Sequence, residues 1–281
     1  KKQDQETTFD QGATLPSIAE ARAQGSLILV AEDDSINQKV ILQQLALLGQ
    51  RAEVADNGAE ALRMWREGDY GLLLTDLNMP EMDGYTLTEA IRREEGGARR
   101  MPILALTANA SKGEMHRATK AGMDEYLTKP IRLQALGAAI KNWLPQADES
   151  PMPAPPAEPL KGETTVAAVD ILVLQGLVGD DPDTVREFIA DYLPSAQKLG
   201  AELGAAAIAG DGAQVKAIAH KLKSSSRTVG AATLAELCAS LEQAGQTGDQ
   251  SAIRQGMADF ETALDAVVAE CRAWLKKNKK G

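Results

Sequence analysis

The sequence is poor in cysteine, histidine and aromatic residues, and it has no long apolar run. Aromatic residues make up only 4% of the 281 residues, so the cores must be built from Leu, Ile, Val and Ala. Two Cys and two His offer few ligands for a zinc site. Both cysteines, Cys238 and Cys271, lie in apolar helical patterns, which is typical of buried free thiols, with a disulfide the less favoured alternative. No run approaches the ~18 apolar residues of a membrane span, and no signal peptide is visible.

Basic residues are also fewer than acidic ones, and the formal net charge is −10. A nucleic-acid binder needs a basic surface, so we expect no nucleic-acid partner. Free thiols and the lack of a span favour a cytoplasmic location with no membrane insertion of this segment. The chain begins at Lys1 without an initiating Met, so we expect a piece of a longer protein or a processed chain.

The first half of the chain has the pattern of a parallel sheet. Residues 1–25 are polar, and we predict a linker there with a short helix near Pro16–Ala23. Over residues 26–145, five short apolar runs alternate with segments of helical spacing, which predicts a doubly wound α/β fold with a five-stranded parallel sheet. The expected strands are Leu27–Ala31, Arg51–Ala55, Leu72–Asp76, Ile103–Thr107 and Glu125–Lys129.

The second half has no strand pattern. Residues 146–159 read QADESPMPAPPAEP, and their five prolines predict a linker over residues 146–165. From 166 to 281, Ala, Leu and Glu recur at helical spacing between turn signals, which predicts an all-α antiparallel helical bundle. We expect one helix to begin at Asp181-Pro182 and to kink or break at Pro194.

Polar side chains follow the predicted strands where the strands end. Because the carboxyl ends of parallel strands meet at one edge of a sheet, we expect these side chains to share a site. Oxygen ligands suit magnesium (Mg2+), and Asp76 is placed to act as a nucleophile toward a phosphoryl group whose charge Mg2+, Lys129 and Thr107 would neutralise. We read Asp34 as a helix N-cap. The residues at the strand ends are Glu32, Asp33, Asp34, Asp76, Thr107 and Lys129.

Residues 26–145 resemble a receiver domain of two-component signalling. The matching segments, in the family's order, are LILVAEDDSINQ, LLLTDLNMPEMDG, PILALTANA and GMDEYLTKPI. The resemblance implies that Asp76 is the phosphoacceptor and that Lys129 is the family's site lysine, with a cis bond to Pro130 common in such domains. It also implies a switch pair, Thr107 and Tyr126. The implied Mg2+ ligands are Glu32, Asp33, Asp76 and the backbone carbonyl of Asn78.

His220 lies in the segment QVKAIAHKLKSSSRTVGA. On a helix, this histidine falls about 150° from the middle of the apolar side, so it is not a core residue. An exposed imidazole can attack a phosphoryl group, and the nearby Lys223 and Arg227 can stabilise the phosphate. An ordinary exposed histidine stays an alternative on periodicity alone. His116 has no lysine three residues later and is read as a surface residue.

The run HKLKSSS resembles the signature of histidine phosphotransfer (Hpt) domains, in which small residues follow a histidine and a lysine. The resemblance implies that His220 is the second phosphoacceptor, with Lys223 and Arg227 stabilising its phosphate. Ser224 stands where family members often carry glycine. Family members also often carry a glutamine on the facing helix, and of Glu242 and Gln243 we assign that role to Gln243.

The two resemblances together imply the C-terminal part of a bacterial hybrid sensor histidine kinase in a phosphorelay. Asp76 would accept a phosphoryl group from a kinase histidine and pass it to His220, which would pass it to a response regulator. No segment resembles the ATP-binding kinase core, so this piece cannot phosphorylate itself from ATP. We expect the parent protein to be anchored in the inner membrane.

Two alternatives remain in view. In the first, a degenerate receiver acts as a docking or regulatory scaffold, and the intact Asp76 and Lys129 count against it. In the second, a haloacid-dehalogenase-type phosphatase would use a carboxylic acid two residues after its nucleophile, and here that position is Asn78.

Overall fold

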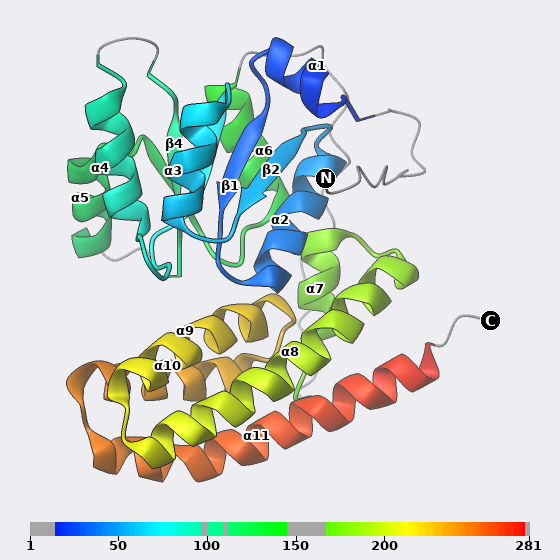
Figure 1. Cartoon of the computed structure of the whole chain (residues 1–281). Helices are drawn as coiled ribbons and strands as arrows, with labels where there is room; N and C mark the ends of the chain where they lie inside the picture. The colour runs from blue at the N-terminus through cyan, green and yellow to red at the C-terminus, as the bar shows by residue number, and fades with distance from the viewer. Residues whose placement is uncertain (1–14, 97–99, 109–111, 145–166, 279–281) are drawn as a thin grey trace.

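The computed structural model describes residues 15–96, 100–108, 112–144 and 167–278. A layered α/β half lies above an all-helical half, and one edge of the sheet faces the helices below it (Figure 1). Among the described residues, no helix is both long enough and apolar enough to cross a membrane.

The α/β half is a five-stranded parallel sheet with the strand order β2-β1-β3-β4-β5. Its three central strands are buried along their whole length, which explains why they are continuous aliphatic runs in the sequence. The fold class that the sequence predicts is confirmed, and the strands agree with the predicted ones to within one residue at each end. They are β1 (Ile28–Ala31), β2 (Ala52–Ala55), β3 (Leu72–Asp76), β4 (Ile103–Thr107) and β5 (Glu125–Thr128).

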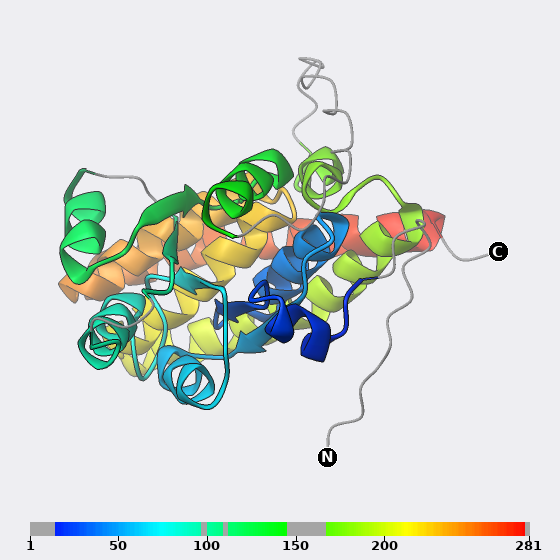
Figure 2. The same cartoon turned by 90° about the horizontal axis from the view of Figure 1, so that it is seen from above.

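Helices cover both faces of this sheet. Strand side chains alternate between two apolar cores, so that Leu29 and Leu73 lie in one core while Ile28 and Leu72 lie in the other. The view from above shows α3 and α4 on one side of the sheet and α6 on the other (Figure 2). The first core is covered by α3 (Gly58–Glu67), α4 (Gly84–Glu94) and α5 (Lys112–Ala121), and the second by α2 (Ser35–Leu47) and α6 (Leu133–Trp143).

The segment before the sheet contains the short helix that the sequence predicts near Pro16–Ala23. A short helix, α1 (Ile18–Ala23), begins at a capping box in which Ser17 and Glu20 bond to each other's backbone N–H groups. Ala21 is fully buried in the first of these two cores, and Arg22 pairs with Glu53 at 3.0 Å. Residues from Ile18 onward therefore pack on the sheet domain, whereas residues 1–14 lie outside the described residues.

The helical half contains five helices among the described residues. Each turn signal predicted from the sequence ends one helix and starts the next, and Asp181, Asp211 and Asp249 cap the helices that follow them. Cys238 and Cys271 are buried free thiols, as expected. The helices are α7 (Ile171–Val178), α8 (Pro182–Ala209), α9 (Gly212–Thr228), α10 (Ala232–Thr247) and α11 (Gln250–Lys277).

Of the two outcomes expected at Pro194, a kink or a break, the break does not occur. Helix α8 begins at Pro182 as expected but continues through Pro194 for 28 residues. A proline inside a helix costs about 3 kcal/mol through its missing N–H group and its steric clash. The burial of Ile189, Tyr192 and Ala196 on either side of Pro194 holds the helix together across this position.

The predicted Pro-rich linker, residues 146–165, lies outside the described residues. The boundaries that we assign to the two domains, 26–145 and 166–281, therefore stay predictions.

The two halves are in direct contact through α2. Its residues Ile36 and Val40, 1% and 5% exposed, belong to the same apolar core as the helical bundle. The side-chain amide of Gln44 donates to the backbone carbonyls of Ile131, at 2.7 Å, and Leu177, at 3.1 Å, and so joins both halves. At the rim, Lys39 pairs with Asp191 and, at 3.5 Å, with Glu187. Helix α2 is thus packed on the sheet with one face and on the bundle with the other.

Candidate functional site

The polar residues that follow the strands meet at one edge of the sheet, as predicted. Glu32, Asp76 and Thr107 are 0%, 4% and 3% exposed. The Nζ atom of Lys129 lies 2.5 Å from Glu32 Oε2 and 2.5 Å from Asp76 Oδ2, and its backbone N–H donates to the carbonyl of Thr107. The Lys129-Pro130 peptide bond is cis. We call Glu32, Asp33, Asp76 and Lys129 the acidic site.

Burial and neighbouring charge shape the protonation of this site. Burial raises the pKa of Glu32 well above its ordinary value, and the charge of Asp76 adds to the effect while Lys129 opposes it. Burial alone would lower the pKa of Lys129, but the charges of Asp76 and Glu32 outweigh it and raise that pKa. Lys129 is therefore a permanent cation, and the carboxylates around it favour a further positive charge.

The geometry of the carboxylates fits a hard divalent cation. Oxygen atoms of Glu32, Asp33 and Asp76 all lie within 4.8 Å of one another, and Mg2+ prefers such oxygen ligands. Asp34 is committed elsewhere, because its carboxylate caps α2 by accepting from the N–H groups of Ile36 and Asn37, both at 3.0 Å. This confirms its reading as an N-cap.

Two backbone features position Asp76, one at its carboxylate and one at its backbone carbonyl. The N–H group of Asn78 donates to Asp76 Oδ1 at 3.1 Å. At the start of α4, Gly84 lets the chain approach closely, since a Cβ there would lie 2.2 Å from the carbonyl oxygen of Asp76. The second oxygen, Oδ2, faces Lys129.

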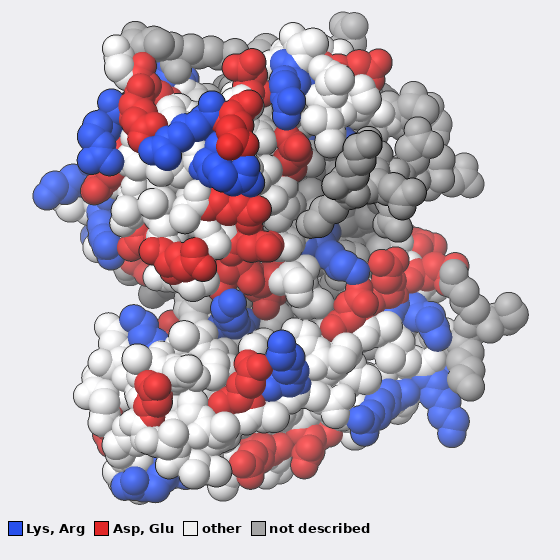
Figure 3. Space-filling model, viewed as in Figure 1, with Lys and Arg blue, Asp and Glu red and all other residues white. Residues whose placement is uncertain are grey.

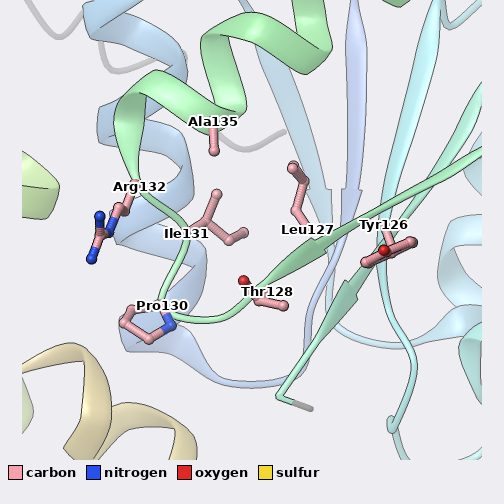
Figure 4. Close-up of a pocket in the computed structure, with 7 residues that line it drawn as sticks. All are labelled: Tyr126, Leu127, Thr128, Pro130, Ile131, Arg132 and Ala135. Atoms are coloured by element: carbon pink, nitrogen blue, oxygen red, sulfur yellow. The ribbon is translucent and has the colours of Figure 1, made fainter. Parts of the chain in front are cut away.

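The expected switch pair is split between the interior and the surface. Thr107 is buried, whereas Tyr126 on β5 is 40% exposed. Tyr126 is one of the residues around a cavity of about 200 Å³ between β5 and the start of α6, which is shown in Figure 4. The residues that line this cavity include no carboxylate, so it is separate from the acidic site.

His220 is held by a carboxylate on the neighbouring helix. Its Nδ1 lies 2.7 Å from Glu242 Oε1, while Lys223 donates to Glu242 Oε2 at 2.5 Å. Although burial favours a proton on Glu242, the hydrogen bonds from His220 and Lys223 outweigh it and lower the pKa of Glu242 to about 2. An ionised Glu242 only accepts hydrogen bonds, so Nδ1 of His220 carries a proton and donates it. In the neutral ring, the lone pair then lies on Nε2.

The surroundings of His220 differ from the expected ones in two respects. Its side chain is only 14% exposed in this arrangement, rather than open to solvent. Gln243 is exposed and is not brought to His220, because Glu242 takes the facing position. At about 100° per residue, Gln243 falls roughly opposite the buried stripe that includes Cys238 and Leu241. Helical periodicity was thus a signal that favours Glu242.

The remaining residues assigned to the bundle site lie as follows. Lys223 is 8% exposed and bonded to Glu242, and Arg227 is half-buried near the end of α9. His116 is exposed on α5, in agreement with its reading as a surface residue.

The acidic site and His220 belong to surfaces that face each other. Lys221, next to His220, lies 2.9 Å from Asp33 Oδ2. Ser224 and Thr228, one and two turns after His220, are both hydrogen-bonded to Asn37 of α2. We call the side of α9 that carries His220, Ser224 and Thr228 the docking face. Asn37, Lys221 and Glu242 have no role that a sequence motif indicates.

Charge is complementary across this junction. Figure 3 shows acidic side chains gathered along the edge of the α/β half that faces the bundle, with both basic and acidic side chains on the opposing edge. In the Lys221–Asp33 pair the bundle supplies the cation, whereas in the Lys39–Asp191 pair the α/β half supplies it. Complementary charge of this sort favours correct pairing of two surfaces.

Two family models match the chain in the order that the fold suggests. The response regulator receiver domain matches residues 28–141, and the Hpt domain matches residues 187–270. The virulence sensor protein BvgS of Bordetella bronchiseptica is 30% identical over 280 residues, which cover 94% of this chain and 22% of BvgS. The sensor histidine kinase RcsC of Escherichia coli is 36% identical over 129 residues, covering 45% of this chain and 13% of RcsC.

Among solved structures, the receiver domain of the sensor histidine kinase PA1611 from Pseudomonas aeruginosa, determined with a magnesium ion in its active site cleft, is 40% identical. It covers 42% of this chain and 97% of that chain, with a TM-score of 0.40. This chain spans only 22% of the length of the BvgS relatives. The chain therefore joins a response regulator receiver domain, residues 28–141, to an Hpt domain, residues 187–270, and both domains belong to phosphorelay signalling.

Proposed function

We propose that Asp76 and His220 are consecutive phosphate carriers in one relay. Asp76 accepts a phosphoryl group from the histidine of a kinase domain, and His220 takes it over and hands it to a separate response regulator. The observation that carries this proposal is the orientation of the two domains. The acidic site faces the docking face, and the Lys221–Asp33 contact joins the residue beside His220 to the residue beside Glu32.

The first transfer uses Asp76 as the nucleophile. An oxygen of its carboxylate attacks the phosphorus atom, a P–O bond forms, and the P–N bond to the donor histidine breaks. Lys129 is a fixed cation 2.5 Å from Asp76 Oδ2 and stabilises the charge on the phosphoryl oxygens. Thr107, buried at the end of β4, offers a hydroxyl at the same edge.

The second transfer uses His220 as the nucleophile. Glu242 holds the Nδ1–H group, so Nε2 attacks the phosphorus, a P–N bond forms, and the Asp76 carboxylate leaves. The phosphorylated ring keeps its Nδ1 proton, which Glu242 continues to accept. Glu242 also engages the ammonium of Lys223 and so keeps this positive charge beside the ring.

Mg2+ is the metal that the acidic site fits best. We propose that Glu32, Asp33 and Asp76, with the backbone carbonyl of Asn78, hold it. When bound, it would neutralise the negative charge of the phosphoryl oxygens. Lys129 supplies the second fixed cation of the same site.

The partners follow from this role. We propose an upstream kinase domain, carried by the same parent protein, and a downstream response regulator with its own receiver domain. The relatives that match the chain are much longer proteins with sensor names. We place this part of the protein in the cytoplasm and expect the parent protein to be anchored in the inner membrane.

The experiment is to supply acetyl phosphate and Mg2+ to the whole chain and to measure its mass. The wild-type chain should gain one phosphate on Asp76 and a second on His220 as transfer proceeds, and Asp76→Asn should gain none. His220→Gln should still be phosphorylated on Asp76 but, once acetyl phosphate has been removed, should fail to label an added response regulator. A His220→Gln variant that labels the regulator at the wild-type rate would refute the role of His220.

The scaffold alternative makes a different prediction in the same experiment. A degenerate receiver would gain no mass with acetyl phosphate and would not bind beryllium fluoride in the presence of Mg2+. Asp76→Asn would then behave like the wild-type chain in both measurements.

A further inference from the structure

A buried polar cluster lies at the centre of the otherwise apolar contact between α2 and the bundle. It consists of Asn37 from the receiver domain and Ser224 and Thr228 from the docking face, and we call it the polar seam. These side chains are 5%, 8% and 5% exposed. Ile36 and Val40, on either side of Asn37 in α2, pack into the bundle core.

Every polar atom of the Asn37 amide has a partner across or beside the junction. Nδ2 donates to Ser224 Oγ at 2.8 Å and to Glu32 Oε1 at 3.2 Å, and Oδ1 accepts from the Thr228 hydroxyl at 2.8 Å. The seam therefore connects the acidic site, through Glu32, to the docking face four and eight residues after His220.

Asn37 depends more on its hydrogen-bond partners across the seam than Thr228 does. The Thr228 hydroxyl has an alternative acceptor, the carbonyl of Ser224 in its own helix at 3.1 Å, so it stays satisfied without Asn37. When the two domains are in contact, Asn37 has no alternative partner of this kind. Its Oδ1 atom is paired with the Thr228 hydroxyl and one Nδ2 hydrogen with the Ser224 hydroxyl. If a buried amide loses these partners, the contact between the domains is weakened by the desolvation free energy of each unpaired polar group.

We propose that the polar seam makes this receiver domain selective for its own Hpt domain. The apolar contacts of Ile36 and Val40 would fit many helices, whereas Asn37 is satisfied only by a helix with hydroxyl side chains four and eight residues after its histidine. A helix with glycine or alanine at these positions is penalised, since specificity is a difference between two affinities. Ser224, the departure from the glycine that we noted in the sequence, is explained as the partner of Asn37.

This selectivity rests on the proposed transfer between the two domains, but it can be measured without phosphate. Cysteines introduced in the whole chain at two exposed positions, Lys141→Cys on α6 and Glu261→Cys on α11, carry a donor and an acceptor dye, while Cys238 and Cys271 are buried. A fall in energy transfer between the dyes reports separation of the two domains as the urea concentration increases. Only urea concentrations below those at which circular dichroism shows unfolding are used.

Isosteric changes test the seam itself. Ser224→Ala and Thr228→Val should each lower the docking constant at least about fivefold, because each leaves one polar group of Asn37 unpaired. The matched control is Ser226→Ala. Ser226 is equally buried in α9, but its hydroxyl bonds to Tyr192 inside the bundle, so the separation curve should not move.

A double-mutant cycle separates pairing from general damage. Asn37→Ala removes the amide that needs the hydroxyls, so adding Ser224→Ala to it should cost much less than Ser224→Ala costs alone. Separation curves that Ser224→Ala and Thr228→Val leave unchanged, or single effects that multiply in the double variant, would overturn the proposal. A chain that fails to take phosphate on Asp76 would refute the proposed function and leave these curves as they are.

Discussion

Glu242 joins His220 to Lys223, and its ionisation should stabilise the Hpt domain in a pH-dependent way. The hydrogen bonds from these two residues lower its pKa from 4.5 to about 2, against the opposing effect of burial. Because the folded-state pKa lies below the unfolded one, the stabilisation is complete above about pH 5 and is lost as the pH falls toward 2. At 1.36 kcal/mol per pKa unit, it amounts to about 3 kcal/mol at neutral pH, and the side chain is only 18% exposed.

The perturbation that isolates this effect is Glu242→Gln, which keeps the shape and removes the charge. Urea unfolding of the wild-type chain and the variant, followed by circular dichroism, should show a difference of about 3 kcal/mol at pH 5 and about half of it at pH 3. Glu236→Gln, at an exposed position of the same helix, is the matched control and should show little difference at either pH. A wild-type advantage over Glu242→Gln that is the same at pH 5 and pH 3 would refute the reasoning.

Two further changes address the acidic site. Lys129→Met leaves the buried carboxylates of Glu32 and Asp76 without their counter-charge, so we expect the free energy of unfolding to fall by about 3–5 kcal/mol. Added Mg2+ should restore part of this loss. Equal stability of the variant and the wild-type chain in urea would contradict the prediction. Lys221→Met frees Asp33 from its ion pair, so calorimetry should show Mg2+ binding up to about fivefold tighter, and an unchanged affinity would mean that Lys221 does not compete for Asp33.

The sheet and the acidic site were readable from the sequence because their signals are local. Runs such as Leu72–Asp76 are aliphatic throughout since both faces of the strand are buried, and the residue that ends each run must lie at one edge of a parallel sheet. The side of α9 that carries His220 followed equally from the helical spacing of Val215, Ala219 and Leu222.

The contact between the domains was not readable in the same way. Helix α2 uses Ile41 and Leu45 against the sheet and Ile36 and Val40 against the bundle. Such a helix is apolar on two sides, which the sequence shows, but periodicity does not say which partner covers the second side. Pro194 shows the same limit, because the packing of distant helices outweighs a local preference.

Occupancy of the docking face has a consequence for the timing of the output. Receiver and Hpt domain are one polypeptide, so α2 meets the docking face at an effective concentration on the order of millimolar. A response regulator that binds the docking face from micromolar concentration would find it occupied most of the time. In the proposed relay, transfer from His220 to the regulator would then be limited by the rate at which α2 leaves α9. A variant that loosens this contact would speed that last step and slow the transfer from Asp76 to His220.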